Sequence, residues 1–89
     1  MERAVITVMG YDQVGIVAEV TRILATSNCN IVDITQTLMQ GIFAMIILIN
    51  LPVETDLTVL REKLLAAGER MGIQITIQHE DIYRYMHRI

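Results

Sequence analysis

An abrupt change of hydrophobic period divides the first thirty residues of this chain. Residues 4–9 (Ala-Val-Ile-Thr-Val-Met) are an apolar run of strand length, which Gly10 is expected to end. Beyond Gly15 the spacing becomes helical and predicts a helix from about Gly15 to Ser27, with one buried stripe formed by Ile16, Val17, Val20, Ile23 and Leu24. Asn28 suits the left-handed conformation that often follows a helix. The chain is therefore expected to begin with a strand and a helix, joined by a loop that contains Gly10 and Gly15.

A β-hairpin is predicted next. From Ile31 to Met39 side chains alternate, with Val32, Ile34 and Leu38 on one face and Asp33, Thr35 and Thr37 on the other. Gln40-Gly41 is a two-residue hairpin signal that leads into a strand over residues 42–51. Because this strand is apolar on both faces, we expect it to be central in a sheet and to have its second face covered as well.

A helix and a strand are predicted after Pro52, so that both halves of the chain have one strand–helix–strand pattern. After Pro52, Thr55 or Asp56 is expected to cap a helix that Gly72 ends, and its apolar stripe is Leu57, Leu60, Leu64, Ala67 and Met71. A strand follows in which Ile73, Ile75 and Ile77 alternate with polar residues. The tail from Asp81 to Ile89 has helical spacing of Ile82, Tyr85, Met86 and Ile89, which predicts a short amphipathic helix.

The element order is thus β-α-β-β-α-β plus a short C-terminal helix. It predicts an α+β fold of the ferredoxin-like kind, with residues 1–89 forming one domain. Right-handed crossovers place both helices on one face of a four-stranded antiparallel sheet. The apolar second face of the strand over residues 42–51 implies that either the tail or another subunit covers the other side.

Composition removes several classes of function. The net charge is −3, from seven Lys or Arg and ten Asp or Glu, and no basic cluster suggests nucleic-acid binding. The longest apolar run, residues 42–49, is far shorter than the roughly 20 residues of a membrane helix. The N-terminus leads straight into a strand without a signal-peptide pattern, so we expect a cytoplasmic protein with no membrane partner.

The chain offers little for catalysis or metal binding. Its single Ser, Cys and Lys and its two His all lie outside the glycine loop. Cys29 follows a helix C-terminus, which does not lower a thiol pKa, and is interpreted as structural. His79 and His87 lack the spacing of a metal motif, and no pair of carboxylates suggests acid–base chemistry. We therefore expect no enzyme activity, no metal and no cofactor.

The loop is the strongest candidate for ligand binding. Free N–H groups at the start of the helix after Gly15 attract a carboxylate or phosphate. A P-loop requires Lys and Ser/Thr where Ile16 and Val17 stand, and the two glycines lack the spacing of a dinucleotide fingerprint. A small zwitterion therefore fits better than a nucleotide. The alternative from spacing alone is that Gly and Asp serve only the geometry of the turn.

Two segments carry a family resemblance. Residues 5–18 (Val-Ile-Thr-Val-Met-Gly-Tyr-Asp-Gln-Val-Gly-Ile-Val-Ala) and 28–37 (Asn-Cys-Asn-Ile-Val-Asp-Ile-Thr-Gln-Thr) resemble an ACT domain. The whole chain, with its Ile-Tyr-Arg-Tyr-Met-His-Arg-Ile tail, looks like the small stand-alone ACT proteins related to the glycine cleavage regulator. The resemblance implies that a free amino acid binds at a subunit interface, between a loop containing Asp12, Val14, Gly15 and Ile16 and a facing segment containing Asn30 and Ile31.

Three functional hypotheses follow. The first is a homodimeric regulatory module that binds an amino acid, in which Asp12 either neutralises an ammonium group or, as we favour, holds the loop through an Asx turn. The second is an interaction or assembly module without a small ligand. The third, a small hydrolase such as an acylphosphatase, needs an Arg in the loop, and residues 10–18 contain none. The regulated enzyme or other partner is unknown.

Overall fold

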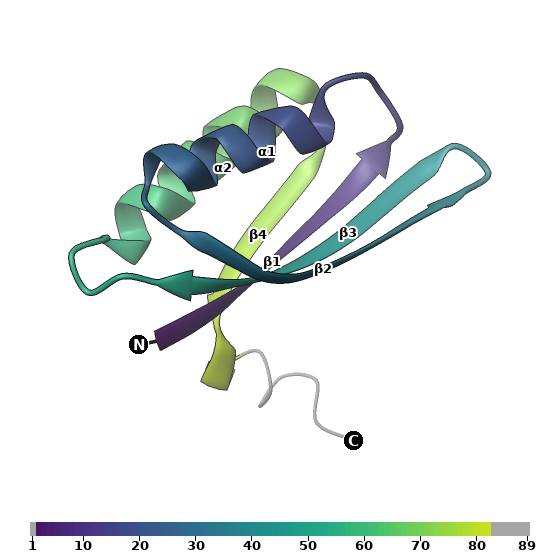
Figure 1. Ribbon diagram of the computed structural model, residues 1–89. Helices are drawn as coiled ribbons and strands as arrows, with labels where there is room; N and C mark the ends of the chain where they lie inside the picture. The colour runs from purple at the N-terminus through teal and green to yellow at the C-terminus, as the bar shows by residue number, and fades with distance from the viewer. Residues whose placement is uncertain (1, 83–89) are drawn as a thin grey trace.

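The computed structural model describes residues 2–82 and shows two helices packed on one face of a four-stranded sheet (Figure 1). The elements, in chain order, are β1 (Glu2–Tyr11), α1 (Ile16–Thr26), β2 (Asn30–Met39), β3 (Ile42–Leu51), α2 (Leu57–Met71) and β4 (Gln74–His79). All neighbouring strands are antiparallel, in the order β2-β3-β1-β4. The predicted ferredoxin-like fold is confirmed. From position 83 on, the expected tail helix lies outside the described residues.

The core lies between the sheet and the helices. Its largest fully buried side chains include Ile6 of β1, Ile47 of β3 and Leu64 of α2. The predicted stripe of α1 is buried at Ile16, Val20, Ile23 and Leu24, whereas Val17 is partly exposed at the edge of the stripe. Burial of such aliphatic side chains, about 1.5–3 kcal/mol each, is the main force that holds the layers together.

Predicted turn chemistry is confirmed at four places. Gln40 and Gly41 both have positive φ, 50° and 82°, and form the two-residue loop between β2 and β3. Asn28 has φ 61° and follows Ser27, the C-cap of α1, as expected. Of the two cap candidates, Asp56 begins α2, because its side chain accepts a hydrogen bond from the Thr58 amide at 2.8 Å. Gly72 then ends α2 in the left-handed conformation.

The expectation that Gly10 ends the first strand is wrong. β1 continues through Gly10 to Tyr11, which pairs with Ile42. A Cβ at position 10 would lie 2.6 Å from the Cγ2 atom of Ile73, so a side chain there would collide with the residue that enters β4. Gly10 therefore serves close packing inside the sheet layer rather than a turn.

β3 is central, as predicted, but its second face is open within residues 2–82. On that face Ile46 is 45% exposed and is aligned with Thr35 of β2 and Thr7 of β1. The Thr7 hydroxyl in turn bonds to that of Thr76 in β4. A row of small hydroxyl side chains thus crosses the open face on both sides of an apolar centre.

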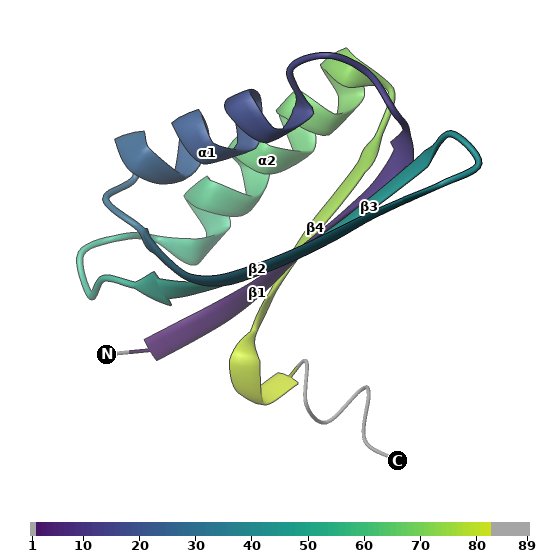
Figure 2. The same ribbon diagram turned by 45° about the vertical axis from the view of Figure 1, so that its right-hand side comes forward.

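β2 is one of the two edge strands of the sheet, and it is the more exposed of them. Its ten residues are all exposed, and Ile34 and Leu38, on the helix-side face, retain 40% and 59% of their surface. A β-bulge between Ile31 and Asp33 interrupts its register with β3. In Figures 1 and 2 the far end of the β2–β3 hairpin extends beyond both helices. The strand therefore presents unpaired backbone and apolar side chains together.

Candidate functional site

The loop between β1 and α1 is held at both of its sides by other parts of the fold. The amide of Asp12 donates to the carbonyl of Gly41 at 2.9 Å, so the loop begins against the tip of the β2–β3 hairpin. The side-chain amide of Gln13 donates to the carbonyl of Met71 at 2.7 Å, which joins the loop to the end of α2. Both contacts fix the position of a segment that is otherwise exposed.

Gly15 begins α1 in a conformation that few other residues adopt. Its φ is 97° and its ψ −1°, and in the described part of the chain no side chain caps the helix at this position. The carbonyl of Gly15 accepts from the amide of Glu19, whereas the N–H groups of the first turn point out of the helix without a side-chain partner. Nothing lies within 4 Å of a Cβ built on Gly15, so open space surrounds this helix end.

The predicted site residues in the loop differ in what they expose. Val14 is fully exposed, whereas the Ile16 side chain is buried in the core, so Ile16 presents only its backbone to a ligand. Within residues 2–82 the carboxylate of Asp12 has no hydrogen-bond partner. The expected Asx turn is therefore not formed, because the backbone bond to Gly41 and the Gln13 side chain hold the loop instead.

Asn30 and Ile31 lie at the other end of the sheet. Asn30 is exposed and pairs with Asn50, which in turn pairs with Arg3 near the start of β1. The loop follows Tyr11, at the far end of β1. Tyr11 is eight residues beyond Arg3, and eight residues of extended strand span about 26 Å. One chain therefore does not bring the two predicted halves of the site together.

Other candidate groups lie away from the loop. Cys29 is buried, and burial raises the pKa of its thiol above the ordinary value of 9.0, which disfavours the reactive thiolate. His79 is the last residue of β4, and its Nε2 atom lies 3.4 Å from a carboxylate oxygen of Glu2 in β1. In the part of the chain that the structure describes, no three His, Cys, Asp or Glu side chains gather as a metal site would require.

Gln13 is a residue that sequence reasoning missed. Its partner, the Met71 carbonyl, lies 58 positions away and belongs to the backbone, so no side-chain pattern announces the contact. Its place inside the glycine loop was the only available signal. Sequence reasoning also missed the ion pair between Glu19 of α1 and Arg70 of α2, whose nearest charged atoms lie 3.7 Å apart.

Comparison with known proteins decides the family. The family model of the ACT domain matches residues 2–78. This range contains both helices and the whole sheet apart from His79, the last residue of β4. The chain belongs to the ACT domain family. ACT domains are regulatory ligand-binding modules, so the resemblance predicted from residues 5–18 and 28–37 is confirmed at the level of the family.

This ACT domain has close relatives of its own size. It is 48% identical over 90 residues to a UPF0237 protein of Methanocaldococcus jannaschii, with full coverage of both chains. Its structure is similar to that of an ACT domain protein from Streptococcus pneumoniae, with a TM-score of 0.81, 36% identity, and coverage of 92% of this chain and 93% of that one. The chain thus resembles small proteins that consist of little besides this domain.

A third similarity is to a candidate glycine cleavage system transcriptional repressor. The TM-score is 0.79 at 26% identity, and the match covers 88% of this ACT domain and 45% of the other chain. The expected relation to the glycine cleavage regulator is therefore confirmed. No helix among the described residues of this ACT domain is long and apolar enough to span a membrane.

Proposed function

We propose that this ACT domain is a non-enzymatic regulatory module that binds a free amino acid between two copies of the chain. The observation that carries the proposal is the start of α1, which no side chain caps within residues 2–82, in the same loop as the Asp12 carboxylate, which has no hydrogen-bond partner among those residues. Backbone N–H groups of Gly15, Ile16 and Val17 suit an α-carboxylate, and Asp12 suits an α-ammonium group. Both charged groups of an amino acid thus have a complement in one loop.

A second subunit supplies the facing wall in this proposal. Asn30 and Ile31 are distant from the loop within one chain, but both lie on the exposed edge strand β2. Two copies of β2 paired antiparallel about a twofold axis at Thr35, with the bulged residue between Ile31 and Asp33 left out of the count, would set Asn30 opposite Met39 of the other subunit. Met39 precedes the hairpin turn that contacts Asp12, so Asn30 of one subunit approaches the loop of the other.

The edge strand supports this arrangement. A long exposed strand without Lys or Pro is prone to pair with another chain, and β2 carries no such residue from Asn30 to Met39. Pairing in a dimer satisfies its free backbone groups and covers Ile34 and Leu38. Two symmetric amino-acid sites then form at the two ends of the paired strands.

Calorimetric titration with each of the twenty amino acids tests the proposal. We expect saturable binding of at least one of them at millimolar concentration or below, lost in Gly15→Asp, which places a negative charge where the carboxylate would bind. Gly15→Ala is the matched control, since it imposes the same strain at positive φ without the charge, and nothing lies within 4 Å of the Cβ position. Absence of binding of all twenty amino acids by a folded dimer would contradict the proposal.

An assembly module without a small ligand is the second candidate. Exposed apolar side chains on the open sheet face, including Met9 and Ile46, favour it. A stoichiometric partner captured from a native extract, and still captured by Gly15→Asp, would support this function over amino-acid binding.

A further inference from the structure

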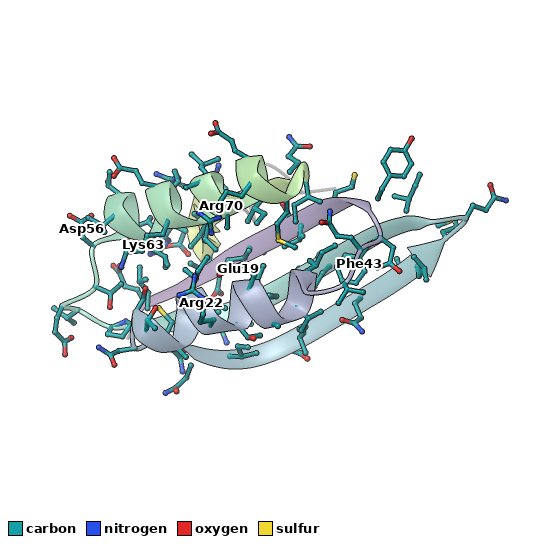
Figure 3. The ribbon with its side chains drawn as sticks, turned by 90° about the horizontal axis from the view of Figure 1, so that it is seen from above. Glu19, Arg22, Phe43, Asp56, Lys63 and Arg70 are labelled. Atoms are coloured by element: carbon teal, nitrogen blue, oxygen red, sulfur yellow. The ribbon has the colours of Figure 1, made fainter. Side chains whose placement is uncertain are left out.

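A basic hollow lies between the two helices, on the side of the molecule away from the sheet. Its volume is about 240 Å³, and its lining comes from α1 (Arg22, Ile23, Thr26) and α2 (Lys63, Ala66, Arg70). Figure 3 shows Arg22 together with Glu19 on α1, and Lys63 and Arg70 on α2. Three cations therefore converge on one small site, which we term the interhelical hollow.

This concentration of positive charge is unexpected in an acidic protein. The net charge of the chain is −3, and residues 2–82 contain five Lys or Arg side chains, of which three line the hollow. The other two are engaged elsewhere, because Arg3 pairs with Glu80 and Arg61 donates to the carbonyl of Ile77. Like charges held close together repel, so the cluster costs free energy that a nearby anion offsets.

One carboxylate positions the two guanidinium groups. An Oε1 atom of Glu19 accepts from the Nε atom of Arg22 at 2.8 Å, and its Oε2 atom lies 3.7 Å from a terminal nitrogen of Arg70. Glu19 thus offsets one of three positive charges and leaves an excess of two. The ammonium group of Lys63 has neither a hydrogen bond nor an ion pair within residues 2–82.

We propose that the interhelical hollow binds a small dianion with the chemistry of a phosphate group. Arg22 already donates its Nε and one terminal nitrogen to Glu19. The donors for phosphate oxygens are therefore those of Arg70, which lies 3.7 Å from Glu19, and the mobile ammonium group of Lys63. The excess of two positive charges equals the charge of the ligand. The site is formed within one subunit, so this proposal does not rest on the amino-acid site or on the dimer.

The test is a titration of the ¹⁵N-labelled full-length protein, followed by NMR at constant ionic strength. The probes are inorganic phosphate and glycerol phosphate, with chloride as the reference anion. We expect saturable shifts centred on Arg22, Lys63 and Arg70, and about tenfold weaker binding in Lys63→Gln, since loss of one charge-assisted contact of about 1.4 kcal/mol has that effect. Tighter binding of glycerol phosphate would identify an ester as the ligand, and equal binding would identify free phosphate.

Arg61→Gln is the matched control because it makes the same change in net charge on the same helix but outside the hollow. Arg61→Gln should weaken phosphate binding less than twofold. If Arg61→Gln does not fold, Arg3→Gln is used as the control in its place. Shifts that do not saturate, or equal weakening by Lys63→Gln and the control, would show only diffuse attraction of anions and overturn the proposal.

Discussion

Gln13 donates a hydrogen bond from its side-chain amide to the carbonyl of Met71, at 2.7 Å, and thereby joins the loop before α1 to the end of α2. The bond satisfies one of the carbonyls that the last turn of a helix leaves without a partner. It also fixes the loop that contains Asp12 and Gly15. The geometry of the proposed amino-acid site thus depends on a contact with the second half of the chain.

Gln13→Ala should weaken amino-acid binding more than it weakens the fold. Loss of this exposed hydrogen bond costs about 0.5–1.5 kcal/mol of unfolding free energy, and a less ordered loop loses affinity for its ligand. Urea unfolding and calorimetry measure the two effects. Gln74→Ala is the control, because Gln74 is exposed on β4, and unchanged affinity in Gln13→Ala would contradict the positioning role.

Gly10→Ala should destabilise the protein by about 1–3 kcal/mol, the usual cost of overpacking a core. The new methyl group would lie 2.6 Å from Cγ2 and 2.9 Å from Cβ of Ile73, on a neighbouring segment that cannot yield freely. Thermal unfolding of Gly10→Ala, of Ile73→Ala and of the double variant checks this. We expect the second substitution to relieve part of the loss, and strict additivity would refute the steric explanation.

Cys29 should make stability fall at alkaline pH. Burial raises the pKa of its thiol above the ordinary value of 9.0, so the folded state holds the proton more firmly than the unfolded state. The stabilisation is complete below that ordinary value and is lost as the pH rises through the raised folded value. Unfolding followed from pH 7 to about 10.5 should show a steeper decline in the native protein than in Cys29→Ala, and parallel curves would contradict this.

Ile34→Lys should convert a dimer into a monomer. Ile34 lies near the middle of β2, and a Lys on an edge strand opposes pairing with another strand. Its side chain is already 40% exposed, so the fold of the subunit should survive. Sedimentation equilibrium measures the change, with Val59→Lys as a control on an exposed position of α2. A native monomer, or a dimer that persists in Ile34→Lys, would exclude assembly through β2.

Local patterns predicted most of the fold because they act over short distances. The helical stripe from Ile16 to Leu24, the Gln40-Gly41 turn and the Asp56 cap each depend on neighbours within a few residues. The error at Gly10 has a different origin. Glycine often breaks a strand, but here it admits Ile73, which is remote in sequence and adjacent in space.

The amino-acid sequence by itself determined the order of strands and helices, the ACT family and the loop in which a ligand is expected. Hydrophobic period, glycine and capping residues encode these features locally. Only the tertiary structure decided that the loop and Asn30 lie at opposite ends of one sheet, that Gln13 reaches Met71, and that Arg22, Lys63 and Arg70 share one hollow. Such relationships arise from strand register and helix packing, which join residues that the sequence keeps far apart.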